Sequence, residues 1–377
     1  MLARCYARSV AEIRPFRALR YDVARAGPVE SLVAPAYDVI GPEERAELLS
    51  RSPYNVVHLT LPDSEEQAGA RFRAWQEQGI LVRETDPATW LLAQTYAGPD
   101  AIERTRTALL AALRVEPYER GVVLPHERTH RGPKEGRLRL LRAVRAQLEP
   151  ILLVYDGEPP FTAPSGPPLL AVDGTRLWRL PPDENVAAAF ADRQLLIADG
   201  HHRYETALAF QQEQGTPESA FMLAALVSTK DAGLTIFPTH RIARAAPELN
   251  AGLRLTSISG GPGEGLRVLE ALTRDHAAFV EYRKGSTVLA EALEETLDSA
   301  AVGRLGLEDV RYTPHVDEAV EAVDAGTAEA AFFVRAPTIQ QVAETARAGR
   351  TMPQKSTYFF PKLPSGLLFL SLEPVSR

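Results

Sequence analysis

The sequence has a single cysteine, Cys5, among its 377 residues. A disulfide within the chain is therefore impossible, and a zinc site built from several cysteines is excluded. The sequence also lacks any run of about 18 apolar residues, the length from which a membrane-spanning helix is recognised. Its first residues carry no long apolar stretch of the kind that directs secretion. We therefore expect a cytoplasmic protein that has no membrane partner.

Positive charge is in deficit, because 42 lysines and arginines face 49 aspartates and glutamates, which gives a net charge of −7. A surface built as a whole for nucleic acid needs the opposite balance, so nucleic acid is not expected as a partner. Hydrophobic residues make up 45% of the chain and charged residues 24%. This composition is that of a globular protein, and the length allows two or three packed units.

Segments with strand and helix patterns alternate along the chain, which predicts a mixed α/β fold. A Pro/Gly-rich joint lies at 157–168. We predict an N-terminal α/β region at 1–157 that carries a basic loop, a central region at 169–245, and a C-terminal α/β region at 246–377. The tail of the last region contains a polar loop, which we expect to return to the functional site.

Several elements are predicted from spacing and turn residues. The stretches ILLVYD (151–156), YNVVHLTL (54–61) and QLLIADG (194–200) are expected to be strands. LLAVDGTRLWRLP (169–181) is expected to be a hairpin that turns at Asp173-Gly174. EEQAGARFRAWQEQGIL (65–81) and HHRYETALAFQQEQG (201–215) have helical spacing, and the second helix is expected to end at Gly215.

The stretch VVLPHERTHRGPKEGRLRLLR (122–142) contains the H-E-x-x-H pattern of zinc peptidases, from His126 to His130. That pattern works inside a long helix, where positions i and i+4 share one face and the glutamate reaches the metal-bound water. Here Pro125 precedes the pattern and Gly132-Pro133 follows it, so at most two helical turns fit between them. We therefore predict no metal site at this pattern.

The same stretch concentrates positive charge. From Pro125 to Gln147 there are seven lysines and arginines against two glutamates, a local patch suited to phosphate. We interpret Arg139, Arg142 and Arg145 as a solvated helix face. The residues in and after the Pro/Gly-bounded loop are the functional candidates, and these are His126, Glu127, Arg128, Lys134 and Arg137.

The segment LLIADGHHRYETALAF combines a strand, a sharp Asp199-Gly200 turn and the first turn of a helix. Backbone N–H groups at a helix start have no helical partner, and the helix dipole favours an anion there. Glycine lets the backbone approach a ligand closely. His201, His202 and Arg203 add donors at the same point, so the turn predicts a phosphate site. The most useful test of this site is whether Arg128, Arg203 and Lys355 point into one cleft.

The sequence ADGHHRYETAL resembles the phosphate-binding box of the ParB/sulfiredoxin superfamily, which unites chromosome-partition proteins, sulfiredoxins and free-serine kinases. Members hold nucleotide phosphates with a Gly-x-x-Arg turn, and Gly200 to Arg203 fit that spacing. The resemblance implies a ParB/sulfiredoxin-like core with additional α/β elements.

The full chain resembles a prokaryotic family catalogued as a domain of unknown function, number ten-fifteen in that series. In that family the position of His130 need not be histidine, and Gly136 stands here where an acidic residue is common. The matching segments, from Pro15 to Leu367, are PFRALRYD, VAPAYDVI, SPYNVVHLTLP, VLPHERT, GPKEGRLRLLRA, ADGHHRYETALA, PTHR and MPQKSTYFFPKLPSGL.

Further polar residues lie at strand ends or in loops, positions where ligand contacts are frequent. The tail loop MPQKSTYFFPK (352–362) can wrap back over a site, and its Lys355 can pair with a phosphate as a point charge. The additional candidates are Tyr37, Asp38, Asn55, Thr239, His240, Arg241, Ser356 and Thr357.

By its resemblance to the free-serine kinases, the chain is expected to be a nucleotide-dependent phosphotransferase that acts on a small hydroxyl metabolite such as a free amino acid. Its cofactor would be ATP or ADP with Mg²⁺, because phosphoryl transfer needs mainly placement and charge neutralisation. Glu127 or Asp199 would be the base or a Mg²⁺ ligand, and His202 is a further catalytic candidate. The phosphate contacts would come from Gly200, His201, His202, Arg203, His126, Arg128, Lys134, Arg137 and Lys355.

Two alternatives stay open. The first is a nucleotide-sensing or DNA-binding regulator like the partition proteins, which would need a helix-turn-helix or a broad basic face; neither is evident. The second is a metal-dependent hydrolase that uses His126, His130, His201 and His202.

Overall fold

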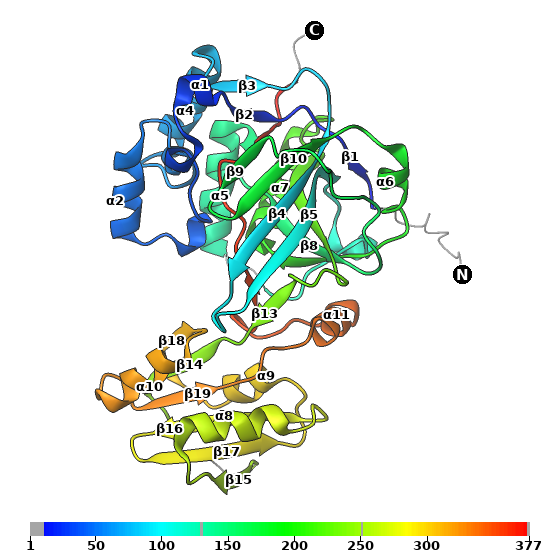
Figure 1. Ribbon diagram of the computed structural model, residues 1–377. Helices are drawn as coiled ribbons and strands as arrows, with labels where there is room; N and C mark the ends of the chain where they lie inside the picture. The colour runs from blue at the N-terminus through cyan, green and yellow to red at the C-terminus, as the bar shows by residue number, and fades with distance from the viewer. Residues whose placement is uncertain (1–10, 129–130, 250–251, 375–377) are drawn as a thin grey trace.

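The computed structural model describes residues 11–128, 131–249 and 252–374 and shows two packed bodies (Figure 1). The larger body contains a nine-stranded sheet and the smaller body a six-stranded sheet. Both sheets are covered by helices, so the mixed α/β class predicted from the sequence is confirmed. Within the described residues, no helix is both long and apolar enough to cross a membrane.

The sheet of the larger body is mixed. The pairs β6–β11 and β8–β12 are parallel, and the other pairs are antiparallel. Its strands, in order across the sheet, are β6 (Val123–Leu124), β11 (Leu195–Asp199), β8 (Ile151–Tyr155), β12 (Phe221–Ser228), β5 (Glu103–Arg114), β4 (Thr89–Ala97), β10 (Thr175–Leu180) and β9 (Leu170–Val172), with β1 (Ile13–Arg14) paired to β5.

The centre of this sheet is apolar on both faces. All eight residues of β12 are buried, which is the burial expected of a continuous apolar run between two helical or loop layers. The helices of this body are α1 (Val23–Ala26), α2 (Pro42–Arg51), α3 (Val57–Thr60), α4 (Glu65–Glu77), α5 (Arg131–Val144), α6 (Glu184–Ala188) and α7 (His201–Gln214). Helix α5 packs between α4 and α7, and its Leu141 joins Phe210 of α7 in the core.

The smaller body has an antiparallel sheet with helices α8 (Gly261–Ala271), α9 (Asp298–Gly303) and α10 (Val316–Asp324). Its strand order is β15 (Arg254–Ser257), β17 (Ser286–Ala292), β16 (Ala277–Arg283), β19 (Ala330–Phe333), β14 (His240–Ala245) and β18 (Glu308–Thr313). The nine-stranded sheet thus combines strands from the regions predicted at 1–157 and 169–245, and the six-stranded sheet draws mostly on the region predicted at 246–377.

After the smaller body, helix α11 (Ile339–Arg347) leads the chain back, and the tail runs through the larger body (Figure 1). Strand β20 (Tyr358–Phe360) pairs with β13 (Thr235–Phe237), the segment by which the chain leaves the larger body. Strand β21 (Leu370–Ser371) pairs with β7 (Ala146–Gln147), and Phe369 bridges to Leu19 of β2 (Leu19–Tyr21), which pairs with β3 (Leu81–Arg83). Phe369 is fully buried and meets Tyr21 and Phe72 edge-on. The tail is therefore part of the core.

Most elements predicted from spacing are confirmed, including β8, β11, α4, the β9–β10 hairpin and the end of α7 at Gly215. The strand predicted at 54–61 is wrong, because residues 57–60 form helix α3. Buried residues there are neighbours in sequence, 55–57 and 59–60, which a helical turn can bury together and an alternating strand cannot. The side chain of Asn55 accepts from the Val57 amide and stabilises the start of this turn.

Candidate anion-binding site

The site is centred on the turn between β11 and α7. The strand ends at Asp199, and Gly200 has φ +101°, in the left-handed region that glycine tolerates. A Cβ atom on Gly200 would lie 2.5 Å from Cγ2 of Ile151 on the neighbouring strand β8. Both the backbone angle and the close approach therefore require glycine here, and the strand–turn–helix box predicted from the sequence is formed.

Replacing Gly200 with alanine is expected to destabilise the protein more than the same change at Gly215. Both glycines have positive φ, which costs a non-glycine residue roughly 1–2 kcal/mol, but nothing lies within 4 Å of a Cβ at Gly215. Crowding against Ile151 adds about 1–3 kcal/mol to the Gly200→Ala variant alone. Denaturant unfolding of the two variants measures the difference, and equal destabilisation would contradict the close approach.

The carboxylate of Asp199 is held between two cations. Its Oδ2 accepts from Nη2 of Arg203 at 2.7 Å, and its Oδ1 pairs with the ammonium of Lys362 from the tail. Burial alone would raise the pKa of Asp199, but Lys362 and Arg203 outweigh it and hold that pKa well below its ordinary value. Lys362 also contacts Oδ2 of Asp38 at 3.2 Å, and Nη1 of Arg203 donates to the carbonyl of Pro150 at 2.6 Å. Asp199 thus fixes both cations at the turn.

His126 and His201 meet beside the turn. The backbone amide of His126 donates to Nε2 of His201 at 3.2 Å. The two imidazole rings lie edge to face, with 4.6 Å between their centroids. The His126 ring makes contacts at both nitrogens, Nδ1 with the carbonyl of Ile197 at 2.7 Å and Nε2 with the Thr357 hydroxyl at 3.0 Å. Burial lowers the pKa of His126 to about 4 and that of His201 well below its ordinary value. Both imidazoles are therefore neutral near pH 7 and serve as hydrogen-bonding groups.

Glu127 supplies another carboxylate to the site, from the segment that precedes α5. Its backbone forms a parallel bridge with Met352, and its side chain, 22% exposed, lies 3.4 Å from the Thr357 hydroxyl. Burial raises the pKa of Glu127 to about 6, although the nearby cation of Lys355 acts against the rise. This carboxyl group can therefore exchange a proton near neutral pH.

Except for His126, which lies behind His201 and Thr357, the polar side chains described so far line one cavity of about 140 Å³, which we term the anion pocket. Its lining is mostly polar, and it joins four parts of the sequence: 37–38, 127–128, the turn at 198–203, and the tail. The lining residues are Tyr37, Asp38, Glu127, Arg128, Ala198, Asp199, Gly200, His201, His202, Arg203, Gln354, Lys355, Thr357, Tyr358, Phe359 and Lys362. Arg128, Arg203 and Lys355 all belong to this lining.

Other predicted residues lie near the anion pocket but not in its lining. Lys134 pairs with Glu205 of α7 at 3.0 Å, and Arg137 stacks its guanidinium over the Tyr37 ring, 3.2 Å from the ring centroid. The Ser356 hydroxyl donates to the carbonyl of Pro353. Farther along α5, Arg139 pairs with Glu65 of α4 and Arg142 pairs with Glu213 of α7. Positive charge on α5 is thus used largely to bind neighbouring helices.

Four predicted residues lie away from the anion pocket. Asn55 is 0% exposed, and its amide donates to the carbonyls of Ser31 and Val33. Thr239, His240 and Arg241 belong to the start of β14 in the smaller body; Arg241 donates to the Thr239 carbonyl and His240 accepts from the Val334 amide. The side chains of Asn55, His240 and Arg241 each satisfy a backbone group, which explains their polar character without a ligand.

The H-E-x-x-H pattern does not form on one helix. Glu127 bridges to Met352 in an extended segment, and α5 begins only at Arg131. His130, which the metal-dependent hydrolase alternative would need, lies outside the described residues. Among the residues that are described, no group of three or more histidine, cysteine, aspartate or glutamate side chains could hold a metal ion.

Lys362 is the main residue of the site that was missing from the sequence-based candidates. It stands alone as a charge in the apolar stretch FFPKLPSGL, which is the signal that could have identified it. Its partner Asp199 lies 163 positions earlier, so only the folded tail shows the pair.

A family model described as "Protein of unknown function (DUF1015)" matches residues 13–295. No curated protein matches the chain. Among solved structures, the chain is similar to a mutant free serine kinase in complex with AMP, with a TM-score of 0.41, 16% identity, and coverage of 69% of this chain and 92% of that chain. A second mutant of free serine kinase, in complex with ADP, has a TM-score of 0.39 at 16% identity and the same coverage. A conserved hypothetical protein from Pyrococcus furiosus has a TM-score of 0.37 at 16% identity, with coverage of 69% and 95%.

Proposed function

The chain belongs to the family described as protein of unknown function (DUF1015), as its sequence segments indicated, and we propose that this member binds a nucleotide through its phosphates in the anion pocket. The observation that carries the proposal is the convergence of a helix start with Arg128, Lys355 and Lys362 in one polar cavity. The start of a helix, where the dipole favours an anion, and cationic side chains are the two features that bind phosphate most directly.

We further propose phosphoryl transfer from that nucleotide to a small hydroxyl compound, such as a free amino acid. The hydroxyl oxygen attacks the terminal phosphorus, its proton passes to the carboxylate of Glu127, and the bond from phosphorus to the leaving phosphate oxygen breaks. Glu127 suits this role because its pKa of about 6 lies close to neutral pH. Asp199 suits it less, since Arg203 and Lys362 already engage both of its oxygens.

Magnesium is the ion that usually accompanies nucleotide phosphates, and when bound it neutralises their charge. The described part of the chain shows no cluster of three side chains suited to hold a metal ion. An accompanying Mg²⁺ would then be held by the phosphates and water, a common arrangement for this ion. We therefore propose no Mg²⁺ ligand from this chain and no catalytic step that depends on one.

Calorimetry with ATP, ADP and CTP tests the proposal, and Lys355→Ala provides its sharpest variant. Lys355 lines the anion pocket, and its side chain is exposed, so its loss should not harm folding. Removing one charge-assisted phosphate contact, worth about 1.5–3 kcal/mol, is expected to weaken nucleotide binding tenfold or more. The matched control is Lys230→Ala, outside the pocket lining, which should bind like the unchanged protein. If none of the three nucleotides binds, the proposal is wrong.

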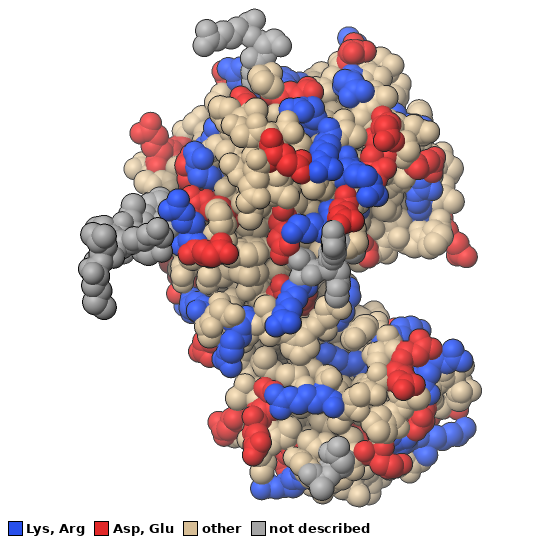
Figure 2. All heavy atoms as spheres, turned by 180° about the vertical axis from the view of Figure 1, so that it is seen from behind, with Lys and Arg blue, Asp and Glu red and all other residues tan. Residues whose placement is uncertain are grey.

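The alternative of a DNA-binding regulator receives no support from the face shown in Figure 2. On the face shown in Figure 2, lysines and arginines are interspersed with aspartates and glutamates. Such mixed charge does not favour the backbone of a nucleic acid, which binds best to a continuous basic stripe.

A further inference from the structure

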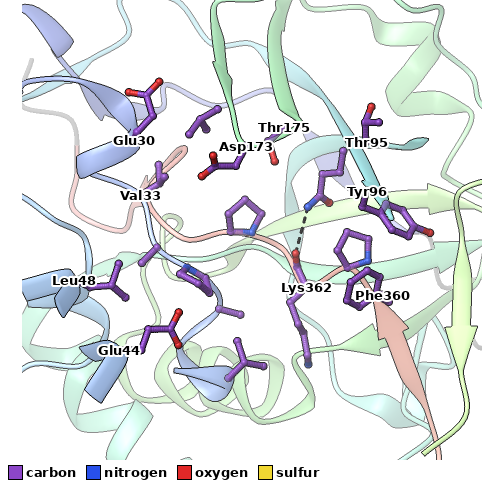
Figure 3. A pocket seen from close by; sticks show the side chains of 18 of the residues that line it. Glu30, Val33, Glu44, Leu48, Thr95, Tyr96, Asp173, Thr175, Phe360 and Lys362 are labelled. Carbon is purple, nitrogen blue, oxygen red and sulfur yellow. Dashed lines mark hydrogen bonds between the residues drawn. The ribbon is translucent and has the colours of Figure 1, made fainter. Parts of the chain in front are cut away.

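A second cavity, of about 400 Å³, adjoins the anion pocket. It lies in the larger body, between the segment 30–51, the ends of β4 and β10, and the tail (Figure 3). Tyr358 and Lys362 belong to the lining of both cavities. The two cavities therefore meet at these two residues.

The walls of the second cavity are mainly apolar and aromatic. Val33, Leu48 and Val172 are buried side chains in its lining. The ring of Phe360 stands edge-on to Tyr358 at 5.5 Å and to Tyr96 at 5.2 Å, which fixes the orientation of all three. Apolar walls with rigid aromatic groups favour an uncharged body that contains rings.

The mouth of the same cavity is acidic. Glu30, Glu44 and Asp173 contribute exposed carboxylates to its lining, and Figure 3 labels all three. Of the two cations in the lining, Arg51 pairs with Glu47, and Lys362 pairs with Asp199 and Asp38. Carboxylates repel phosphate or carboxylate groups, whereas they accept hydrogen bonds from hydroxyl and amino groups. The two cavities are thus complementary in charge to opposite ends of one ligand.

The boundary between the two cavities is held rigidly. Buried Arg106 of β5 donates to the Gln94 side chain at 2.6 Å and to the carbonyl of Pro361 at 2.7 Å. The amide of Gln94 in turn donates to the carbonyl of Lys362 at 3.2 Å, the dashed line in Figure 3. Figure 3 shows the Lys362 side chain extending away from this carbonyl. The backbone of Lys362 is therefore fixed at the second cavity, while its ammonium serves the anion pocket.

We propose that the second cavity binds the nucleoside half of the nucleotide whose phosphates occupy the anion pocket. A nucleoside combines an uncharged ring system with hydroxyl and amino donors, which matches apolar walls and an acidic mouth. The volume lies within the ~300–1,000 Å³ typical of small-molecule sites. This inference depends on the proposed function, because it needs phosphates in the anion pocket.

Titration with inorganic pyrophosphate and with ADP tests the inference. Thr95→Trp places a large side chain in the second cavity, at a partly exposed position on β4. The variant is expected to bind ADP about tenfold more weakly, a loss of about 1.4 kcal/mol, and to bind pyrophosphate as the unchanged protein does. The matched control is Thr105→Trp. Thr105 shares the hydroxyl hydrogen bond with Thr95 at 2.9 Å but does not line the cavity, so this variant should bind both ligands normally.

A second filling variant, Val39→Trp, guards against a folding defect at Thr95, because Val39 lines the cavity and is 47% exposed. If pyrophosphate and ADP bind the unchanged protein but both tryptophan variants leave ADP binding intact, the inference is overturned and the proposed function stands. Equal weakening of both ligands in both variants also overturns the inference. If neither ligand binds the unchanged protein, the proposed function itself fails.

Discussion

Replacing Lys362 with methionine is expected to lower the free energy of unfolding by about 3 kcal/mol and to weaken nucleotide binding. Removing one member of a buried ion pair costs about 3–5 kcal/mol, because the other charge stays buried without compensation. The lower end applies here, since Asp199 keeps Arg203 as a second partner and each side chain of the Lys362–Asp199 pair is 19% exposed. Denaturant unfolding gives the stability, and calorimetry with ADP gives the binding.

Two further variants separate the ion pair from other effects of the change at Lys362. Lys284→Met removes a lysine that donates to a backbone carbonyl on the surface, and should change stability by no more than about 0.5 kcal/mol. Asp199→Asn also takes the carboxylate from Arg203, so the double variant with Lys362→Met is compared with both single variants, and the two changes should cost less together than the sum of their separate costs. A Lys362→Met protein as stable as the unchanged one would show that the pair does not hold the tail to the turn.

Replacing Glu127 with glutamine is expected to lower phosphoryl transfer by about 10²–10⁴-fold, the usual contribution of a general base. Glutamine keeps the shape of glutamate but cannot accept the proton of the attacking hydroxyl. Nucleotide binding should be retained, because the phosphate contacts come from other residues. The measurement is nucleotide turnover with a panel of small hydroxyl compounds that includes free serine.

The pH profile distinguishes a base from a residue that only supports the fold. Burial raises the pKa of Glu127 to about 6, so the carboxylate form is lost as pH falls below that value. Transfer by the unchanged protein should therefore rise with pH through about 6 and then level off, and the Glu127→Gln variant should lack this rise. Glu119→Gln, at an exposed position, serves as the control. A variant at position 127 that keeps both rate and profile would exclude Glu127 as the base.

The anion-binding turn could be predicted from the sequence because its signal is local. The five residues 199–203 contain the glycine that indicates a backbone bend after the strand, and the two histidines and the arginine that supply polar groups. The structure adds that Gly200 has no room for a side chain against Ile151, a contact between strands that spacing does not reveal.

The partners of charged residues could not be predicted. Lys134 and Arg137 lie in the basic stretch that suggested phosphate, yet Lys134 pairs with Glu205 and Arg137 stacks on Tyr37. The pairing of Lys362 with Asp199 could not be predicted either, because it depends on how the tail crosses the larger body. The sequence shows which side chains are charged, but only the folded structure shows which residues they pair with.

The segment 54–61 shows the same limit for secondary structure. Its β-branched residues favour a strand by propensity, but burial of Val56, Val57 and Leu59 against the N-terminal core selects a helix. Tertiary packing outweighs local propensity in so short an element.

The passage of the tail through the larger body has a consequence for synthesis on the ribosome. Folding of a nascent chain can begin with its N-terminal parts, at roughly 5–20 residues per second. The turn at Asp199-Gly200 is made early, but Lys362 is added 163 positions later. A growing polypeptide therefore exposes an unfinished pocket, with Asp199 lacking its second cation, until translation has passed the entire smaller body.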